Sequence, residues 1–171
     1  MVIQQDSEKR LYIKRGLPNI KKSIYAFSVL SESKTKQALE GILSEKELHA
    51  REEISIEKYA KQVNIEANLM VELFRTYIFP AALRYQNTLF GAAVELPSFS
   101  QNLQKAILAT DQLEKIRSEA VALPWEARAK IFCDQVLPKM EEVRLAVDAL
   151  EQLIPHDLWP LPKYREILFI R

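Results

Sequence analysis

The amino-acid sequence predicts an all-α protein, an antiparallel up-down-up bundle of long helices with short N-terminal helices and an extended, proline-containing C-terminal tail. Three glycines in 171 residues are too few for a protein of strands and tight turns. Apolar residues recur at helical spacing over two long stretches, and prolines separate these stretches. We expect residues 1–43, with short helices and a connector, and residues 44–171, with the long bundle and tail, to form one domain.

The first 43 residues are predicted to hold two short helices joined by a connector. A helix over about residues 6–15 would end at Gly16, and Pro18 would prevent its continuation. The following segment, GLPNIKKSIYAFSVLSES, has no helical period, so we expect it to be extended. A second short helix is expected over about residues 33–43.

The first long helix has a clear start signal. Ser44-Glu45-Lys46-Glu47 has the form of a capping box, in which the Ser44 and Glu47 side chains accept bonds from free backbone N–H groups. Apolar residues then alternate at spacings of four and three, as on the packing face of a coiled coil. They are Ile56, Ala60, Val63, Ala67, Met70, Phe74, Tyr77 and Ala81. Because Pro80 interrupts the hydrogen-bond ladder, we expect a kink at residues 76–79, with the helix continuing to about residue 95.

An intermediate helix is predicted over about residues 99–122, after Leu96 and Pro97 end the first long helix. Ser98 and Gln101 are expected to cap its start. The next turn contains Pro124, which we place in the first turn of the last long helix.

The last long helix carries an apolar face and a second kink site at Pro138. Its predicted face consists of Phe132, Val136, Met140, Val143, Val147, Leu150 and Ile154. Pro160 and Pro162 cannot both lie inside a helix, so the chain is expected to leave it and run extended.

Charge and composition exclude several classes of function. The 24 basic and 23 acidic residues nearly cancel, so no global field favours nucleic acid or an anionic membrane. The first 22 residues are locally basic, and we interpret them as a solvated segment rather than a phosphate site. The sequence holds no 18-residue apolar span and no signal-peptide pattern. Cys133 is the single cysteine, so no internal disulfide is possible and a cytoplasmic protein is expected.

No catalytic constellation emerges from the residues. A di-iron bundle needs Glu three positions before each histidine, but Lys46 precedes His49 and Leu153 precedes His156. His49 with Glu53 has the spacing of a metal pair, although a surface pair beside a charged run is the simpler interpretation. Cys133 lies among apolar residues, which indicates a buried, inert thiol. We therefore predict no catalytic residue, no metal ligand and no cofactor-binding residue in this chain.

Four stretches share, in order, the motifs of one known family. They are EKRLYIKRGLPNIKKS at 8–23, LHAREEISIEKYAKQVNIEANLM at 48–70, IFPAALRYQN at 78–87 and VRLAVDALEQLIPHDLWPLPKYREILF at 143–169. Together they resemble the C-terminal portion of type III glutamine synthetases, the large bacterial class. In full-length members, ATP-dependent glutamate-ammonia ligases, the ATP and divalent-metal sites lie upstream of the matched part. The resemblance therefore implies a non-catalytic domain or fragment with a structural or assembly role in glutamine biosynthesis.

Large apolar residues of the first kink and of the tail are possible interface residues. They are Met70, Phe74, Tyr77, Trp159, Leu161, Tyr164 and Phe169. The tail either closes the core of its own bundle or contacts a neighbouring subunit or domain, and the resembled family forms ring-shaped oligomers. The partners implied are a second copy of the chain or a glutamine synthetase catalytic domain. Two alternatives stay open, a free-standing helical protein–protein interaction module and a subunit of a split glutamine synthetase.

Overall fold

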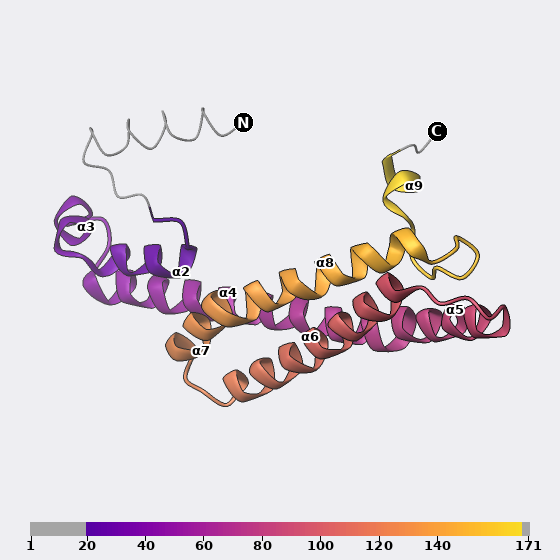
Figure 1. Cartoon of the computed structure of the whole chain (residues 1–171). Coiled ribbons are helices and arrows are strands. Elements are labelled where there is room, and N and C mark those ends of the chain that lie inside the picture. The colour runs from indigo at the N-terminus through magenta and orange to yellow at the C-terminus, as the bar shows by residue number, and fades with distance from the viewer. Residues whose placement is uncertain (1–19, 169–171) are drawn as a thin grey trace. The chain divides into compact units, whose positions relative to one another are not determined.

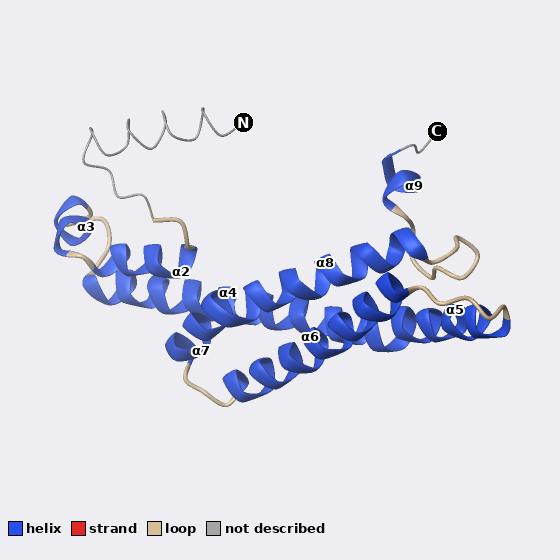
Figure 2. Ribbon diagram, in the orientation of Figure 1, coloured by secondary structure: helices blue, strands red, loops and turns tan. Residues whose placement is uncertain are grey.

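The computed structural model describes residues 20–168, and every regular element in this part of the chain is a helix (Figure 1). Figure 2 shows only helices and loops in these residues, so the all-α prediction is confirmed. The helix expected at residues 6–15 and most of the basic segment lie outside the described residues. The chain divides into two compact units, Met1–Ile56 and Glu57–Arg171. The division expected at residues 43 and 44 remains a prediction.

The described part of the N-terminal unit is more helical than expected. It contains α2 (Ser23–Ala26), the 3₁₀ helix η1 (Phe27–Ser31), α3 (Ser33–Ala38) and the start of α4 (Glu45–Leu73). The prediction of an extended connector is wrong over residues 23–31. Without glycine or proline between residues 20 and 40, this segment forms short helical turns, and Ile24 is buried. The helix expected to reach residue 43 ends at Ala38, and Gly41 adopts a left-handed φ of 81° in the following turn.

The predicted capping box is present at the start of α4. The backbone N–H of Ser44 donates to Glu47 Oε2 at 2.7 Å, and the Ser44 hydroxyl donates to the same oxygen at 2.8 Å. In return, the N–H of Glu47 donates to Ser44 Oγ at 3.3 Å. The bond from the Ser44 backbone is the main reason that the pKa of Glu47 lies below its ordinary value of 4.5.

Both predicted kinks are π-helical turns placed just before a proline. The segments are η2 (Phe74–Ile78), α5 (Phe79–Gly91), α7 (Trp125–Ile131), η3 (Phe132–Val136) and α8 (Leu137–Leu153). The N–H of Phe79 donates to the carbonyl of Phe74, five residues earlier, and η3 has the same pattern two residues before Pro138. The wider turn makes room for the ring of Pro80, which would clash with a carbonyl in an α-helix. The chain therefore continues through each proline.

The π turn also changes which side chains face the core. Tyr77 was predicted on the packing face of the first long helix but is 48% exposed, whereas Ile78 is only 5% exposed. A π turn contains one more residue than an α turn, so the apolar face passes from Phe74 to Ile78. The rest of the predicted face is buried, apart from the half-buried Met70: Ile56, Ala60, Val63, Ala67, Phe74 and Ala81.

Helix α6 (Pro97–Val121) starts two residues earlier than predicted. Its N-cap is Leu96, which makes no side-chain cap bond, so the predicted Ser98 cap is wrong. Pro97 occupies the first helical position, where its fixed φ suits the helix and its missing N–H costs nothing. Pro124 is the N-cap of α7, with ψ of 154°, and therefore lies just outside the first turn in which we placed it.

The turn from α6 to α7 is held by one arginine. Arg128 donates from Nη2 to the carbonyl of Leu123 at 3.0 Å and to the carbonyl of Val121. Its guanidinium carbon also lies 4.2 Å from the centre of the Trp125 ring. Arg128 thus satisfies carbonyls at the C-terminal end of α6 and stacks on an aromatic face.

Within the unit Glu57–Arg171, cross-helix contacts pair the α4–α5 segment with α6 in opposite directions. Arg117 Nη1 donates to Asn64 Oδ1 at 3.2 Å, and the rings of Tyr85 and Phe99 meet edge to face at 5.2 Å. Residues later in the α4–α5 segment therefore contact residues closer to the N-terminus of α6, so the two segments are antiparallel. Helix α8 packs along α6, as Figure 1 shows.

The core of this unit lies where η2, α5, α6, α8 and the tail meet. Its buried residues are Phe74, Ile78, Ala82, Phe99, Leu103, Ala106, Ala146, Leu150, Ile154 and Trp159. The predicted face of the last long helix is confirmed, since five of its residues are buried and Met140 and Val147 are half-buried. Apolar burial on this scale is the main stabilising contribution of the fold.

The tail is not extended throughout. After α8 ends at Leu153, residues 154–163 are non-helical, but a short helix α9 (Tyr164–Leu168) follows. Pro160 and Pro162 prevent a helix only up to their own positions, so nothing opposes a new start at residue 164. Lys163 Nζ donates to the carbonyls of Glu151 at 3.0 Å and Ile154 at 2.8 Å, and so caps the C-terminal end of α8.

Candidate functional site

Two of the predicted interface residues belong to the core. Phe74 and Trp159 are 3% and 7% exposed, and both pack in the cluster described above. Trp159 therefore closes its own bundle, which is the first of the two interpretations of the tail. Phe169 and the side chain of Tyr164 lie outside the described residues.

Two further predicted residues, Met70 and Leu161, line a groove of about 310 Å³ between α4, η2 and α8, which we call the α4–α8 groove. Nine of its twelve lining residues are apolar, and they include Leu69 and Met140. Charged side chains, such as that of Glu66, also line it. Methionine side chains adapt to irregular apolar surfaces, so this lining suits contact with another apolar surface. Tyr77 is exposed but does not line the groove.

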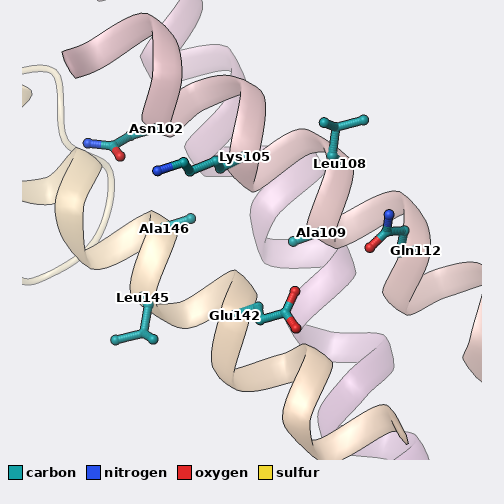
Figure 3. Close-up of a pocket in the computed structure, with 8 residues that line it drawn as sticks. All are labelled: Asn102, Lys105, Leu108, Ala109, Gln112, Glu142, Leu145 and Ala146. Carbon is teal, nitrogen blue, oxygen red and sulfur yellow. The ribbon is translucent and has the colours of Figure 1, made fainter.

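A second hollow, of about 400 Å³, lies between α6 and α8, and we call the surface around it the α6–α8 face (Figure 3). It is lined by Asn102, Lys105, Leu108, Ala109, Gln112, Glu142, Leu145 and Ala146. Figure 3 shows Leu108 and Leu145 pointing away from each other on the two flanks. Sequence reasoning missed this face, because Leu145 lies outside the predicted apolar face of the last long helix and no apolar face was predicted for the helix that carries Leu108.

The histidines form exposed pairs with carboxylates. His49 Nε2 lies 3.5 Å from Glu53 Oε1, and His156 Nδ1 lies 3.0 Å from Glu166 Oε1. Among residues 20–168, no three or more histidine, cysteine or acidic side chains are grouped as a metal ion would require. None of the helices described combines the length and apolar character needed to cross a membrane.

Cys133 is buried, as predicted. Burial, together with a hydrogen bond to this thiol, raises the pKa of Tyr59 above its ordinary value. The neutral tyrosine is therefore the form that the folded state favours.

Comparison with known proteins matches nearly all of this chain to one part of much longer proteins. A family model described as "Glutamine synthetase C-terminal domain" matches residues 9–96. The type-3 glutamine synthetase of Dictyostelium discoideum is 31% identical over 186 residues, covering 95% of this chain and 25% of the relative. The glutamine synthetases of Bacteroides fragilis (strain YCH46) and Butyrivibrio fibrisolvens are 29% and 28% identical, covering 92% and 91% of this chain and 25% of each relative. The chain thus spans about a quarter of the length of these curated relatives.

Proposed function

The chain belongs to the glutamine synthetase C-terminal domain family, and from this membership we propose that it does structural or assembly work in a type III glutamine synthetase rather than the ligase chemistry itself. The observation that carries the proposal is the alignment, in which 91–95% of this chain corresponds to a quarter of each relative. The remaining three quarters of the relatives are where ATP, metal and substrate sites are expected. A cytoplasmic location is part of the proposal, since a single buried cysteine suits a reducing compartment.

The α4–α8 groove is the surface that we assign to contact with the rest of the enzyme. Its apolar lining resembles the core of a protein–protein interface, and the charged residue Glu66 supplies part of a polar rim. Leu69 lines the groove and is 50% exposed, so it offers apolar area that a partner can bury. Leu161 joins the groove to the C-terminal tail, so both predicted apolar regions contribute to one surface.

A chimera tests this function. The matching C-terminal quarter of the Bacteroides fragilis glutamine synthetase would be replaced by this chain and compared with the same enzyme truncated before that quarter. We expect the chimera to regain native mass and glutamine formation relative to the truncated enzyme. Leu69→Glu in the chimera should reverse the gain, whereas Ile65→Glu, at a 66% exposed position on the same helix that does not line the groove, should not.

Other outcomes would point elsewhere. Activity restored by adding this chain as a separate molecule to the truncated enzyme would favour a subunit of a split synthetase. A chimera no better than the truncated enzyme would reject the assembly role and favour a free-standing interaction module. Glutamine formation by the purified chain alone, from ATP, glutamate and ammonia, would refute the absence of catalysis.

A further inference from the structure

We propose that the C-terminal segment of this chain, from α9 onward, folds into the α4–α8 groove of the same molecule and covers it as a further helix of the bundle. This covering does not depend on any role in glutamine synthetase. Its consequence rests on the proposed function: the segment competes with the rest of the enzyme for the groove and has to leave before that contact forms. The inference rests on helix direction, chain continuity, exposed apolar area and charge.

The direction of the helices leaves one place for a further helix. The α4–α5 segment and α6 are antiparallel, and α8 in turn runs antiparallel to α6. In Figure 3, Lys105 of α6 lies beside Ala146 of α8. Gln112, later in α6, lies beside Glu142, earlier in α8. Helices α4 and α8 therefore run in the same direction, with the groove between them. A segment that follows α8 and returns along this groove is antiparallel to both, as is usual in bundles with short connections.

The chain after α8 already enters this groove. Leu161 lines it and packs against the core cluster that includes Ile154, so the entry lies at the C-terminal end of α8. Two residues separate Leu161 from the start of α9. Along α8 the groove extends from Asp148 to Met140, which is about 12 Å at the rise of an α-helix. Residues 164–171, if helical throughout, would span about the same length. The segment is therefore long enough to cover the groove.

Helix α9 carries apolar area that its position in this structure leaves exposed. Ile167 and Leu168 are 55% and 75% exposed, and neither lines the groove. A helix of little more than one turn is not stable unless it packs against other elements. Glu166 Oε1 lies 3.0 Å from His156 Nδ1 in the turn after α8, but an ion pair between exposed side chains contributes little. Packing of the two apolar side chains in the groove therefore outweighs the loss of this pair.

The groove and the segment carry complementary charges. Glu66, Arg144 and Asp148 line the groove, so acidic residues predominate there. Residues 164–171 contain two arginines and one glutamate, so basic residues predominate in the segment. Because α4 and α8 run in the same direction, Glu66 and Asp148 lie toward opposite ends of the groove. The two arginines likewise stand near the two ends of the segment in sequence. Opposite charges across the rim favour this occupant over an acidic one.

Disulfide trapping in the full chain at low concentration tests the covered groove. Leu168→Cys would be combined with Leu69→Cys or with Leu73→Cys, because both leucines line the groove about one helical turn apart. We expect the pair in register to form a disulfide within one chain at least about tenfold faster than the control pair with Asn68→Cys. Asn68 is exposed on α4 and does not line the groove.

Leu168→Cys alone controls for pairing with the native thiol, which is buried. Tryptic peptides identify the linked positions, and the intact mass shows whether one chain or two are joined. Equal rates for the groove pairs and the control pair, or linkage only between chains, would overturn the proposal.

Amide hydrogen exchange tests the same closure without introduced cysteines. Packing in the groove should slow exchange at the amides of Ile167 and Leu168 at least about tenfold relative to an unprotected chain. Leu69→Glu should remove this protection, whereas Asn68→Glu, at the neighbouring exposed position, should retain it. Circular dichroism should show the same helix content in both variants. Unprotected exchange at α9 in the wild type would overturn the proposal.

The outcomes distinguish this inference from the proposed function. Closure in the isolated chain together with a chimera no better than the truncated enzyme would keep the covered groove and reject the enzyme role. Absence of closure together with a chimera that Leu69→Glu inactivates would do the reverse. Where both hold, Leu168→Glu in the chimera should raise the assembled fraction, because it weakens the competing segment. An unchanged fraction would refute the competition.

Discussion

Replacing Trp159 with alanine should destabilise the unit Glu57–Arg171 by about 3–5 kcal/mol, the usual cost of deleting a large buried aromatic side chain. The ring is 7% exposed and packs among residues of η2, α6 and α8, so its removal leaves a cavity that several helices line. It also removes the main apolar anchor of residues 154–163. The measurement is urea unfolding followed by far-ultraviolet circular dichroism, with the free energy extrapolated to water.

Trp159→Phe separates the ring from its N–H group. The Nε1 atom of Trp159 is buried, and no residue of 20–168 accepts a hydrogen bond from it. An unpaired buried donor costs about 1–3 kcal/mol, so phenylalanine loses some packing but removes this penalty. We expect the free energy of unfolding to change by no more than about 1.5 kcal/mol. If the phenylalanine variant lost as much stability as the alanine variant, the indole N–H would have a partner. If the alanine variant lost less than about 1 kcal/mol, Trp159 would not belong to the core.

Three further predictions concern local interactions. Arg128→Ala should lower the free energy of unfolding by about 1–2 kcal/mol, because it removes the hydrogen bonds to backbone carbonyls and the stacking on Trp125. Arg128→Lys should recover only part of this stability, because lysine lacks the planar guanidinium. If thermal unfolding showed full recovery in Arg128→Lys, the planar shape of the guanidinium would be unimportant. Ser44→Ala should cost about 1 kcal/mol at neutral pH. The pKa of Glu47 is lower in the folded state than in the unfolded state, so its bonds to Ser44 stabilise the fold fully above the unfolded pKa and are lost as the pH falls through the folded pKa. The difference in the free energy of unfolding between the wild type and Ser44→Ala should therefore become smaller in acid. A difference that does not change with pH would contradict the capping role. Arg75 makes two ion pairs with acidic residues of α6, but these pairs are exposed and screened by salt. Arg75→Ala should therefore change the free energy of unfolding by less than about 1 kcal/mol. A larger loss in urea unfolding that persists at high salt would indicate that the Arg75 side chain has a packing role.

The local signals in the sequence were sufficient for much of the fold. The capping box at Ser44 requires only residues three positions apart, and it is present at the expected helix start. The apolar face from Phe132 to Ile154 follows from helical periodicity alone, and it faces the core. Pro80 and Pro138 indicated where the helices depart from regular geometry. The cap and the two proline sites depend on residues within about one helical turn, and the apolar face depends on a repeating pattern along one helix.

Other features depend on how distant segments pack, and the tertiary structure decided them. The prolines indicated a kink but not a π turn, so the exchange of Tyr77 for Ile78 in the core could not be anticipated. Trp159 had two possible environments in the sequence, and only the packing of α6 and α8 around it placed it in its own core. The hollow at Ala109 and Ala146 exists because two helices align these small residues, and alignment across helices has no signature in the order of either one. Periodicity reports which face of a helix is apolar, whereas the register between helices is set by side-chain interdigitation over the whole interface.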